Sequence, residues 1–215
     1  MTLRTRHKHS VASALAGLVV AAGVATGSAQ VTPTEPDAQG PEIVTTDPQG
    51  NDEAAARATH LDSLFEQLGD QNNAEWPNVQ NQIWAAWSQS GSDSMDLLLL
   101  RATQAMDERD LDAALTHLDD LVRLAPGFPE GWNKRATVYF LRGDYGESVA
   151  DIQRTLTLEP RHFGALSGLG IILDRLGDED GALRAYRRVA EIHPHMEAAQ
   201  QAIERLAPDV DGREL

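Results

Sequence analysis

The sequence predicts an all-α fold built from stacked antiparallel helix hairpins, and three observations support that prediction. First, three proline-ended blocks recur at an interval of 34 residues and close at Pro126, Pro160 and Pro194. Second, each block has a turn signal near its middle, such as Gly143-Asp144, between two stretches of helix-forming residues. Third, no segment shows the sustained apolar and polar alternation of a half-buried strand.

Large and small side chains recur in phase within the blocks. One register position holds the large residues Leu98, Trp132 and Leu166. Another, four places later, holds the small residues Ala102, Ala136 and Gly170. A small neighbour lets two helix backbones approach where a bulky side chain lies at their crossing. Each hairpin is then expected to bury its remaining apolar face on the next one in a one-dimensional stack.

This pattern resembles the tetratricopeptide repeat family, in which large, small and proline positions recur in a helix-turn-helix unit. The resemblance covers roughly half of the chain, from about residue 95 to residue 207. It implies a right-handed superhelix with three clear repeats, a degenerate N-terminal hairpin and a C-terminal capping helix. The repeats are expected at residues 95–128, 129–162 and 163–196.

Residues 52–94 are expected to form the degenerate hairpin. They keep the repeat phase, because Leu64 lies 34 residues before Leu98 and Trp84 lies 34 residues before Leu118. The closing proline and the small residues of the pattern are missing. Terminal repeats are often atypical, so we expect this hairpin to cap the array.

Composition predicts the remaining segments. Residues 197–207 place apolar side chains on one helical face and are expected to form the capping helix, followed by a frayed tail at 208–215. Residues 30–51 hold four prolines among polar and acidic residues. Their apolar surface is too small to offset the entropy of ordering, which predicts a disordered linker.

Residues 1–29 are typical of an export signal. A basic stretch from Arg4 to His9 precedes an apolar run from Val11 to Val24, and small residues follow up to Ala29. The run is shorter than the roughly 20 residues that span a bilayer, so cleavage after Ala29 would leave no stable membrane anchor. An uncleaved segment is the alternative. We expect the mature protein in the periplasm, where a chain without cysteine depends on helix packing for stability.

The charge balance excludes one class of partner. The formal net charge is −15, and removal of the three cationic residues of the signal makes it −18. Nucleic-acid binding depends on neutralising phosphates with Lys and Arg, so nucleic acid is not an expected partner.

Motifs for catalysis are weak. Gly168 and Gly170 resemble the start of a dinucleotide fingerprint, but the third glycine and the preceding strand are missing. No cofactor, metal site or enzymatic activity is expected. The alternative is a metal-dependent hydrolase that uses His162, His193 and His195, which stacked repeats would bring near one another.

The resemblance also implies a concave groove lined by the first helices of successive hairpins. Repeat phase assigns to this groove Leu99, Thr103, Met106, Asn133, Thr137, Phe140, Ser167, Ile171 and Asp174. Because apolar residues dominate it, an apolar helix or an extended segment is the expected ligand. Packing against neighbouring helices is the alternative for Leu99, Met106 and Ile171.

These observations favour a non-catalytic periplasmic adaptor that binds a protein or peptide partner in the groove and acts in the assembly of an envelope complex. Fold alone does not determine function. A second candidate surface is the cluster of Trp76, Trp84 and Trp87, which is otherwise expected to be the core of the first hairpin. Self-association into a homo-oligomer, through the tryptophans or through the end of the stack, is a further alternative.

Overall fold

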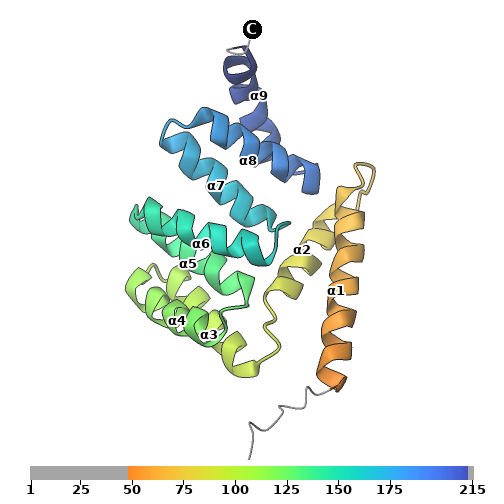
Figure 1. Cartoon of the computed structure of the whole chain (residues 1–215), viewed down its shortest axis with the longest axis vertical. Helices are drawn as coiled ribbons and strands as arrows, with labels where there is room; N and C mark the ends of the chain where they lie inside the picture. The colour runs from red at the N-terminus through yellow and green to blue at the C-terminus, as the bar shows by residue number, and fades with distance from the viewer. Residues whose placement is uncertain (1–47, 213–215) are drawn as a thin grey trace, which may run out of the picture. The chain divides into compact units, whose positions relative to one another are not determined.

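The computed structural model describes residues 48–212, and these residues form helices joined by short turns (Figure 1). The helices are α1 (Pro48–Gly69), α2 (Trp76–Trp87), α3 (Asp93–Asp107), α4 (Leu111–Leu124), α5 (Pro129–Arg142), α6 (Tyr145–Leu158), α7 (Phe163–Arg175), α8 (Glu179–Ile192) and α9 (Glu197–Asp211). No strand occurs among the described residues, and none of their helices is long and apolar enough to cross a membrane. The predicted all-α fold is confirmed.

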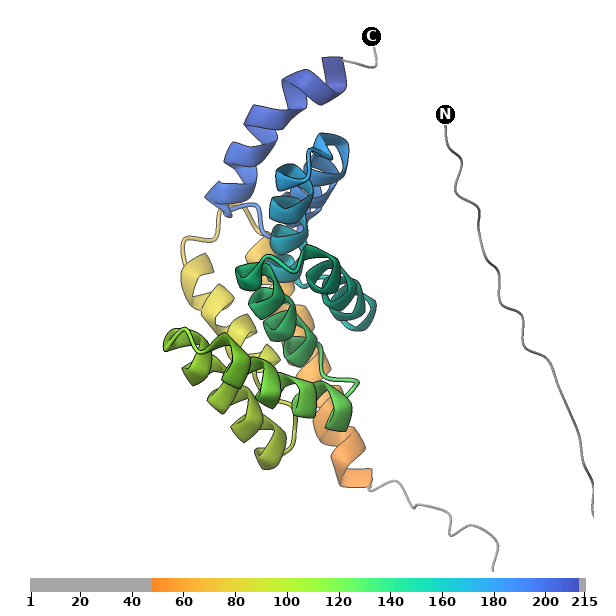
Figure 2. The same ribbon diagram turned by 90° about the vertical axis from the view of Figure 1, so that its left-hand side faces the viewer.

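Three hairpins pair α3 with α4, α5 with α6 and α7 with α8. Each hairpin packs on the next through α4 with α5 and α6 with α7, and α9 packs on α8 at the C-terminal end (Figure 2). The stack of hairpins with a final capping helix agrees with the fold that the repeats predict.

The ends of the described region differ from the sequence expectations. The predicted signal at residues 1–29 lies outside the described residues, as does most of the linker, whose last residues 48–51 open α1. At the other end, α9 continues through Pro208 to Asp211, four residues beyond the predicted helix end. An ion pair of 2.7 Å between Arg187 and Asp211 holds this last turn against α8.

The turn inside each hairpin contains one residue with a left-handed backbone, at the same repeat position. Gly143 and Gly177 have φ angles of 86° and 80°, and Arg109 has a φ of 61°. In this region a Cβ atom crowds the following carbonyl oxygen, a strain that glycine avoids. Asp110 and Asp178 then cap the next helices by accepting hydrogen bonds from backbone N–H groups.

We expect Arg109→Gly to raise the free energy of unfolding by about 1 kcal/mol, because it relieves the left-handed strain in the first repeat. Urea denaturation followed by circular dichroism measures this change. The control is Arg101→Gly in the exposed interior of α3, which should lose about 1 kcal/mol. A loss of stability for Arg109→Gly would show that its side chain contributes more than its backbone strain costs.

An arginine joins three helices of the first two repeats. Arg135 on α5 forms a two-pronged ion pair with the buried Asp151 on α6, at 2.6 and 2.8 Å. Its third contact, at 2.8 Å, reaches Asp119 on α4. The hydrogen bonds from Arg135 to Asp151 raise the pKa of the arginine further above its ordinary value, since they favour the charged form. This network fixes the stacking of repeat one on repeat two.

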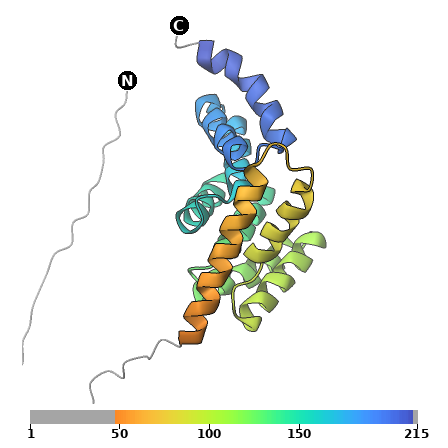
Figure 3. The ribbon, with the colours of Figure 1, turned by 90° about the vertical axis from the view of Figure 1, so that its right-hand side faces the viewer.

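The N-terminal hairpin does not stack on the first repeat. Helices α1 and α2 pair with each other. Outside the hairpin they pack against the α6–α7 turn, α8 and the α8–α9 turn (Figure 3). Leu64, Phe65 and Ile83 belong to one apolar core with Phe163 and Leu166 of α7. The expectation that this degenerate hairpin caps the array does not hold at α3 and α4, because repeat phase describes the pairing inside a hairpin and not the surface on which it docks.

Candidate functional site

A cavity of about 250 Å³ lies between α5 and α7, the first helices of the second and third hairpins. Five of the predicted groove residues line it, namely Asn133, Thr137, Phe140, Ser167 and Ile171. Small residues of α7, such as Gly168, leave the space, and the buried Ile152 and Ile172 also line it. None of the described lining residues is charged. The cavity therefore suits an uncharged, apolar group.

The polar groups of this cavity are mostly engaged within their own helix. The Thr137 hydroxyl donates to the Asn133 carbonyl at 2.9 Å, and the Asn133 amide donates to Glu130 at 3.0 Å. The Ser167 hydroxyl lies 3.4 Å from the sulfur of Met196, which precedes α9. These contacts leave the apolar surface as the main feature presented to a ligand.

Phe140 and Ile171 provide the accessible apolar surface. Phe140 is half-buried, with its ring centroid 5.8 Å from that of Tyr145 and 5.0 Å from the Arg175 guanidinium carbon. Ile171 is 40% exposed and lines the cavity, so part of its side chain is accessible to a ligand. These two residues are the candidates for direct contact with a partner.

The other predicted groove residues lie outside this cavity. Leu99 is only 5% exposed and belongs to the core of the first hairpin, so its assignment to the groove surface is corrected. Met106 packs partly against the same core, and the Thr103 hydroxyl donates to the Leu99 carbonyl. Asp174 forms an ion pair with Arg205 of α9. Close packing in the first hairpin and the cover from α9 therefore confine the open groove to its middle part.

Comparison with known proteins agrees with the repeat pattern. The sequence model of the tetratricopeptide repeat family matches residues 99–158 and 142–197. A TPR repeat-containing protein of Rhizobium etli is 39% identical over 153 residues, which are 71% of this chain and 75% of the relative. The chain belongs to the tetratricopeptide repeat (TPR) family.

Several solved structures share the fold. The Sgt2 TPR domain from Aspergillus fumigatus has a TM-score of 0.52 at 21% identity, and the match covers 57% of this chain and 83% of that domain. The crystal structure of MamA has a TM-score of 0.51 at 21% identity and covers 72% of this chain and 84% of that chain. The first TPR of Spaghetti (RPAP3), bound to the HSP90 peptide SRMEEVD, has a TM-score of 0.52 at 19% identity, with coverage of 54% and 93%.

The three histidines of the proposed metal site are held by separate partners in this TPR array. His162 Nδ1 accepts a hydrogen bond of 3.1 Å from the Ala165 amide, and its Nε2 lies 3.1 Å from a carboxylate oxygen of Glu130. His193 Nε2 lies 2.6 Å from the Gln80 oxygen. Within residues 48–212, no three His, Cys, Asp or Glu side chains form a group that could hold a metal ion.

These histidines instead contact the tryptophan rings of the N-terminal hairpin. The Trp87 ring stacks on His162 with centroids 4.0 Å apart, and Trp76 stacks on His195 with centroids 5.3 Å apart. Trp76 also meets the edge of His193 at 5.4 Å. The tryptophans therefore form the interface between hairpin and repeats, in contrast to a core confined to the hairpin.

Burial changes the acid–base behaviour of this interface. His193 is 1% exposed, and its burial lowers its pKa to about 4, with a smaller contribution from repulsion by a charged His195. Its Nδ1 atom is buried and has no hydrogen-bond partner among the described residues. A neutral His193 is thus part of the docked state.

Sequence reasoning missed the docking site of the hairpin, although two signals were present. The first was the concentration of tryptophan in α2. The second was the occurrence of His162 and His193 beside the prolines that end successive TPR units. Aromatic rings and neutral imidazoles stack well, but no periodicity connects residues so far apart in the chain.

Proposed function

We propose that this chain is a non-catalytic periplasmic adaptor, which holds an apolar segment of a partner protein between α5 and α7. The observation that supports the proposal best is the cavity there, which is open and apolar and has no charged residue among those described in its lining. TPR domains are typical protein–protein interaction modules, and two solved relatives in fold were determined with peptides of HSP90 and Hsp70. The proposed partner differs in chemistry from an acidic tail, because none of the described lining residues is a cation that could pair with a carboxylate.

The position of the cavity supports an elongated ligand with an apolar side chain at its centre. Phe140 of α5 and Ile171 of α7 line the cavity from its two sides. The helices α5 and α7 belong to successive hairpins of the stack. An apolar side chain inserted between them would cover the exposed part of Ile171. Burial of apolar area contributes roughly 25 cal/mol per Å², so such an anchor would dominate the binding energy.

The test is site-specific photo-crosslinking in the native host. A photoreactive phenylalanine analogue replaces Ile171 in otherwise wild-type chain and in the Phe140→Asp variant, and the adduct is recovered from the osmotic-shock fraction. We expect one discrete adduct whose yield falls at least about tenfold in Phe140→Asp, because a charge in the cavity disfavours an apolar anchor. Its mass would also report cleavage after Ala29.

Two control variants test whether the adduct depends on the cavity. Leu141→Asp alters the neighbouring residue, which is 55% exposed and does not line the cavity, and should leave the adduct unchanged. The same analogue at Leu176, which is 62% exposed at the end of α7, should give no adduct with that partner. Equal yields of the adduct from Phe140→Asp and wild type, with unchanged helical content, would contradict the proposal that the partner binds in the groove.

A further inference from the structure

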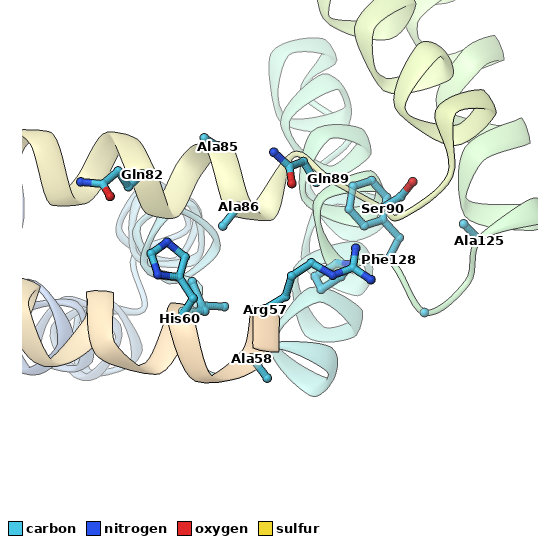
Figure 4. Close-up of a pocket in the computed structure, with 13 residues that line it drawn as sticks. Arg57, Ala58, His60, Gln82, Ala85, Ala86, Gln89, Ser90, Ala125 and Phe128 are labelled. Atoms are coloured by element: carbon cyan, nitrogen blue, oxygen red, sulfur yellow. The ribbon is translucent and has the colours of Figure 1, made fainter. Parts of the chain in front are cut away.

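A second cavity, of about 740 Å³, lies between the N-terminal half of α1 and the C-terminal half of α2. The α4–α5 turn closes one side of it through the buried Phe128 and the half-buried Pro129 (Figure 4). The cavity therefore lies where the hairpin meets the α4–α5 turn. It shares no lining residue with the groove between α5 and α7, and its role does not depend on the function proposed above.

The sequence of the hairpin explains the space. In one half of the seam between α1 and α2, large residues such as Leu64, Phe65 and Ile83 fill the interface. In the other half the lining residues of α2 include Ala85 and Ala86. Small side chains at these positions leave an unfilled volume with an apolar floor. A cavity of this size lies in the range of pockets for small organic ligands, which is about 300 to 1,000 Å³.

Arg57 is the charged group among the described lining residues. Arg57 and His60 of α1 both line the cavity, and none of the described lining residues is a carboxylate. This is unusual in a chain with 33 acidic and 18 basic residues. Arg57 forms no ion pair with any side chain that the structure describes. Asp62, one turn further along α1, is already paired with Arg161 at 2.7 Å.

The α2–α3 turn limits the position of the Arg57 guanidinium. A Cβ atom at Gly91 would lie 3.0 Å from Arg57 Nη1, and the φ angle of Gly91 is 86°. The positive φ angle accounts for the glycine, and the Arg57 guanidinium lies directly beside it. Figure 4 shows the Arg57 side chain directed toward Phe128 and Ser90 at one end of the cavity, with His60 further along α1.

Two amides and the Ser90 hydroxyl are the uncharged polar side chains, besides His60, of the described lining. Gln82 and Gln89 of α2 both line the cavity. Gln82 donates a long hydrogen bond of 3.4 Å to the Asn78 carbonyl. Because this bond is weak, the amide can exchange it for a hydrogen bond to a ligand at little cost in free energy. A cation at one end, amides along one wall and an apolar floor match a ligand with a negative head and an apolar body.

We propose that this cavity binds a small organic carboxylate with an aliphatic body, such as a medium-chain fatty acid. The carboxylate pairs with the Arg57 guanidinium, which can form two parallel hydrogen bonds to it. The aliphatic chain lies on Ala86, Leu61 and the neighbouring apolar lining. The ligand therefore bridges the hairpin and the first repeat.

The probe is octanoate, titrated calorimetrically into the purified exported chain at pH 7.5. Octanol and octyltrimethylammonium carry the same aliphatic chain with a neutral and a cationic head. We expect octanoate to bind with 1:1 stoichiometry and to bind at least about tenfold more tightly than octanol, since a charge-assisted hydrogen bond is lost in the alcohol. Equal binding of octanoate and octanol, or no binding of octanoate, would overturn the proposal.

Matched variants locate the site. Arg57→Gln should weaken octanoate binding about tenfold or more, and Arg101→Gln, at an exposed arginine of α3 outside the cavity, should not change it. Ala86→Leu adds volume to the cavity wall and should also weaken binding. The melting temperature of each variant without octanoate shows that it is folded. Unchanged affinity in folded Arg57→Gln would place octanoate elsewhere and contradict the site.

Discussion

Trp87→Ala is expected to lower the free energy of unfolding by about 3 to 5 kcal/mol, the usual cost of removing a buried tryptophan. Trp87 is 5% exposed, stacks on His162 and lies 5.0 Å from Phe163 between ring centroids. Its loss removes the central contact between the hairpin and the repeats. Urea denaturation measures the change, and limited proteolysis at the α2–α3 turn, Ser88–Ser92, reports release of the hairpin.

The control for Trp87→Ala is Gln82→Ala on the exposed face of α2, which should change stability by less than about 0.5 kcal/mol. A loss below about 1 kcal/mol for Trp87→Ala, with no increase in proteolysis, would mean that the docked hairpin contributes little to the stability of the chain.

A pair of glycines on α7 tests the same interface from the side of the repeats. A Cβ at Gly164 would lie 2.6 Å from the Trp84 ring, whereas one at Gly168 would make an ordinary contact at 3.6 Å.

Gly164→Ala is therefore expected to displace Trp84 and to destabilise the hairpin by about 1 to 3 kcal/mol. Gly168→Ala lies on the same helix and should be neutral or stabilising, because alanine favours helix over glycine by about 1 kcal/mol. Equal effects of the two substitutions would contradict the docked position of α2.

Acidification is expected to destabilise the protein by about 3 kcal/mol between pH 6.5 and pH 4 through His193 alone. Burial lowers the pKa of His193 in the folded chain to about 4, against an ordinary value of 6.5. Between these values the unfolded chain binds the proton and the folded chain does not. The stability contribution is therefore complete above pH 6.5, and it decreases as the pH falls, by about 1.4 kcal/mol per unit.

The measurement is urea denaturation at pH 7 and pH 4.5 for wild type and His193→Gln. The variant keeps a hydrogen-bonding side chain for Gln80 but cannot titrate, so its loss of stability over this range should be smaller by about 2 kcal/mol or more. His117→Gln on α4, away from the hairpin, is the control and should behave as wild type. The same pH slope in His193→Gln and wild type would assign the acid sensitivity to other groups.

Repeat phase predicted much of the candidate groove but not its extent. Asn133, Thr137, Phe140, Ser167 and Ile171 do line one cavity, and whether a partner binds there stays a prediction. Leu99 shares their phase but lies in the core, because the first hairpin packs more closely around it. Asp174 shares their phase as well, but α9 supplies Arg205 as its partner. Phase describes the direction of a side chain, and neighbouring elements decide whether it remains accessible.

The sequence by itself determined the three hairpins from α3 to α8, their stacking and their turns. Each of these features depends on residues close in the chain or one repeat apart, such as Ala136 and Gly170 at helix crossings. Only the tertiary structure decided where the N-terminal hairpin docks. That decision rests on Trp76 and Trp87 stacking on histidines that lie 75 or more residues away, and on the burial of His193 beneath them. Such contacts follow from matching surfaces in space, which a local period cannot encode.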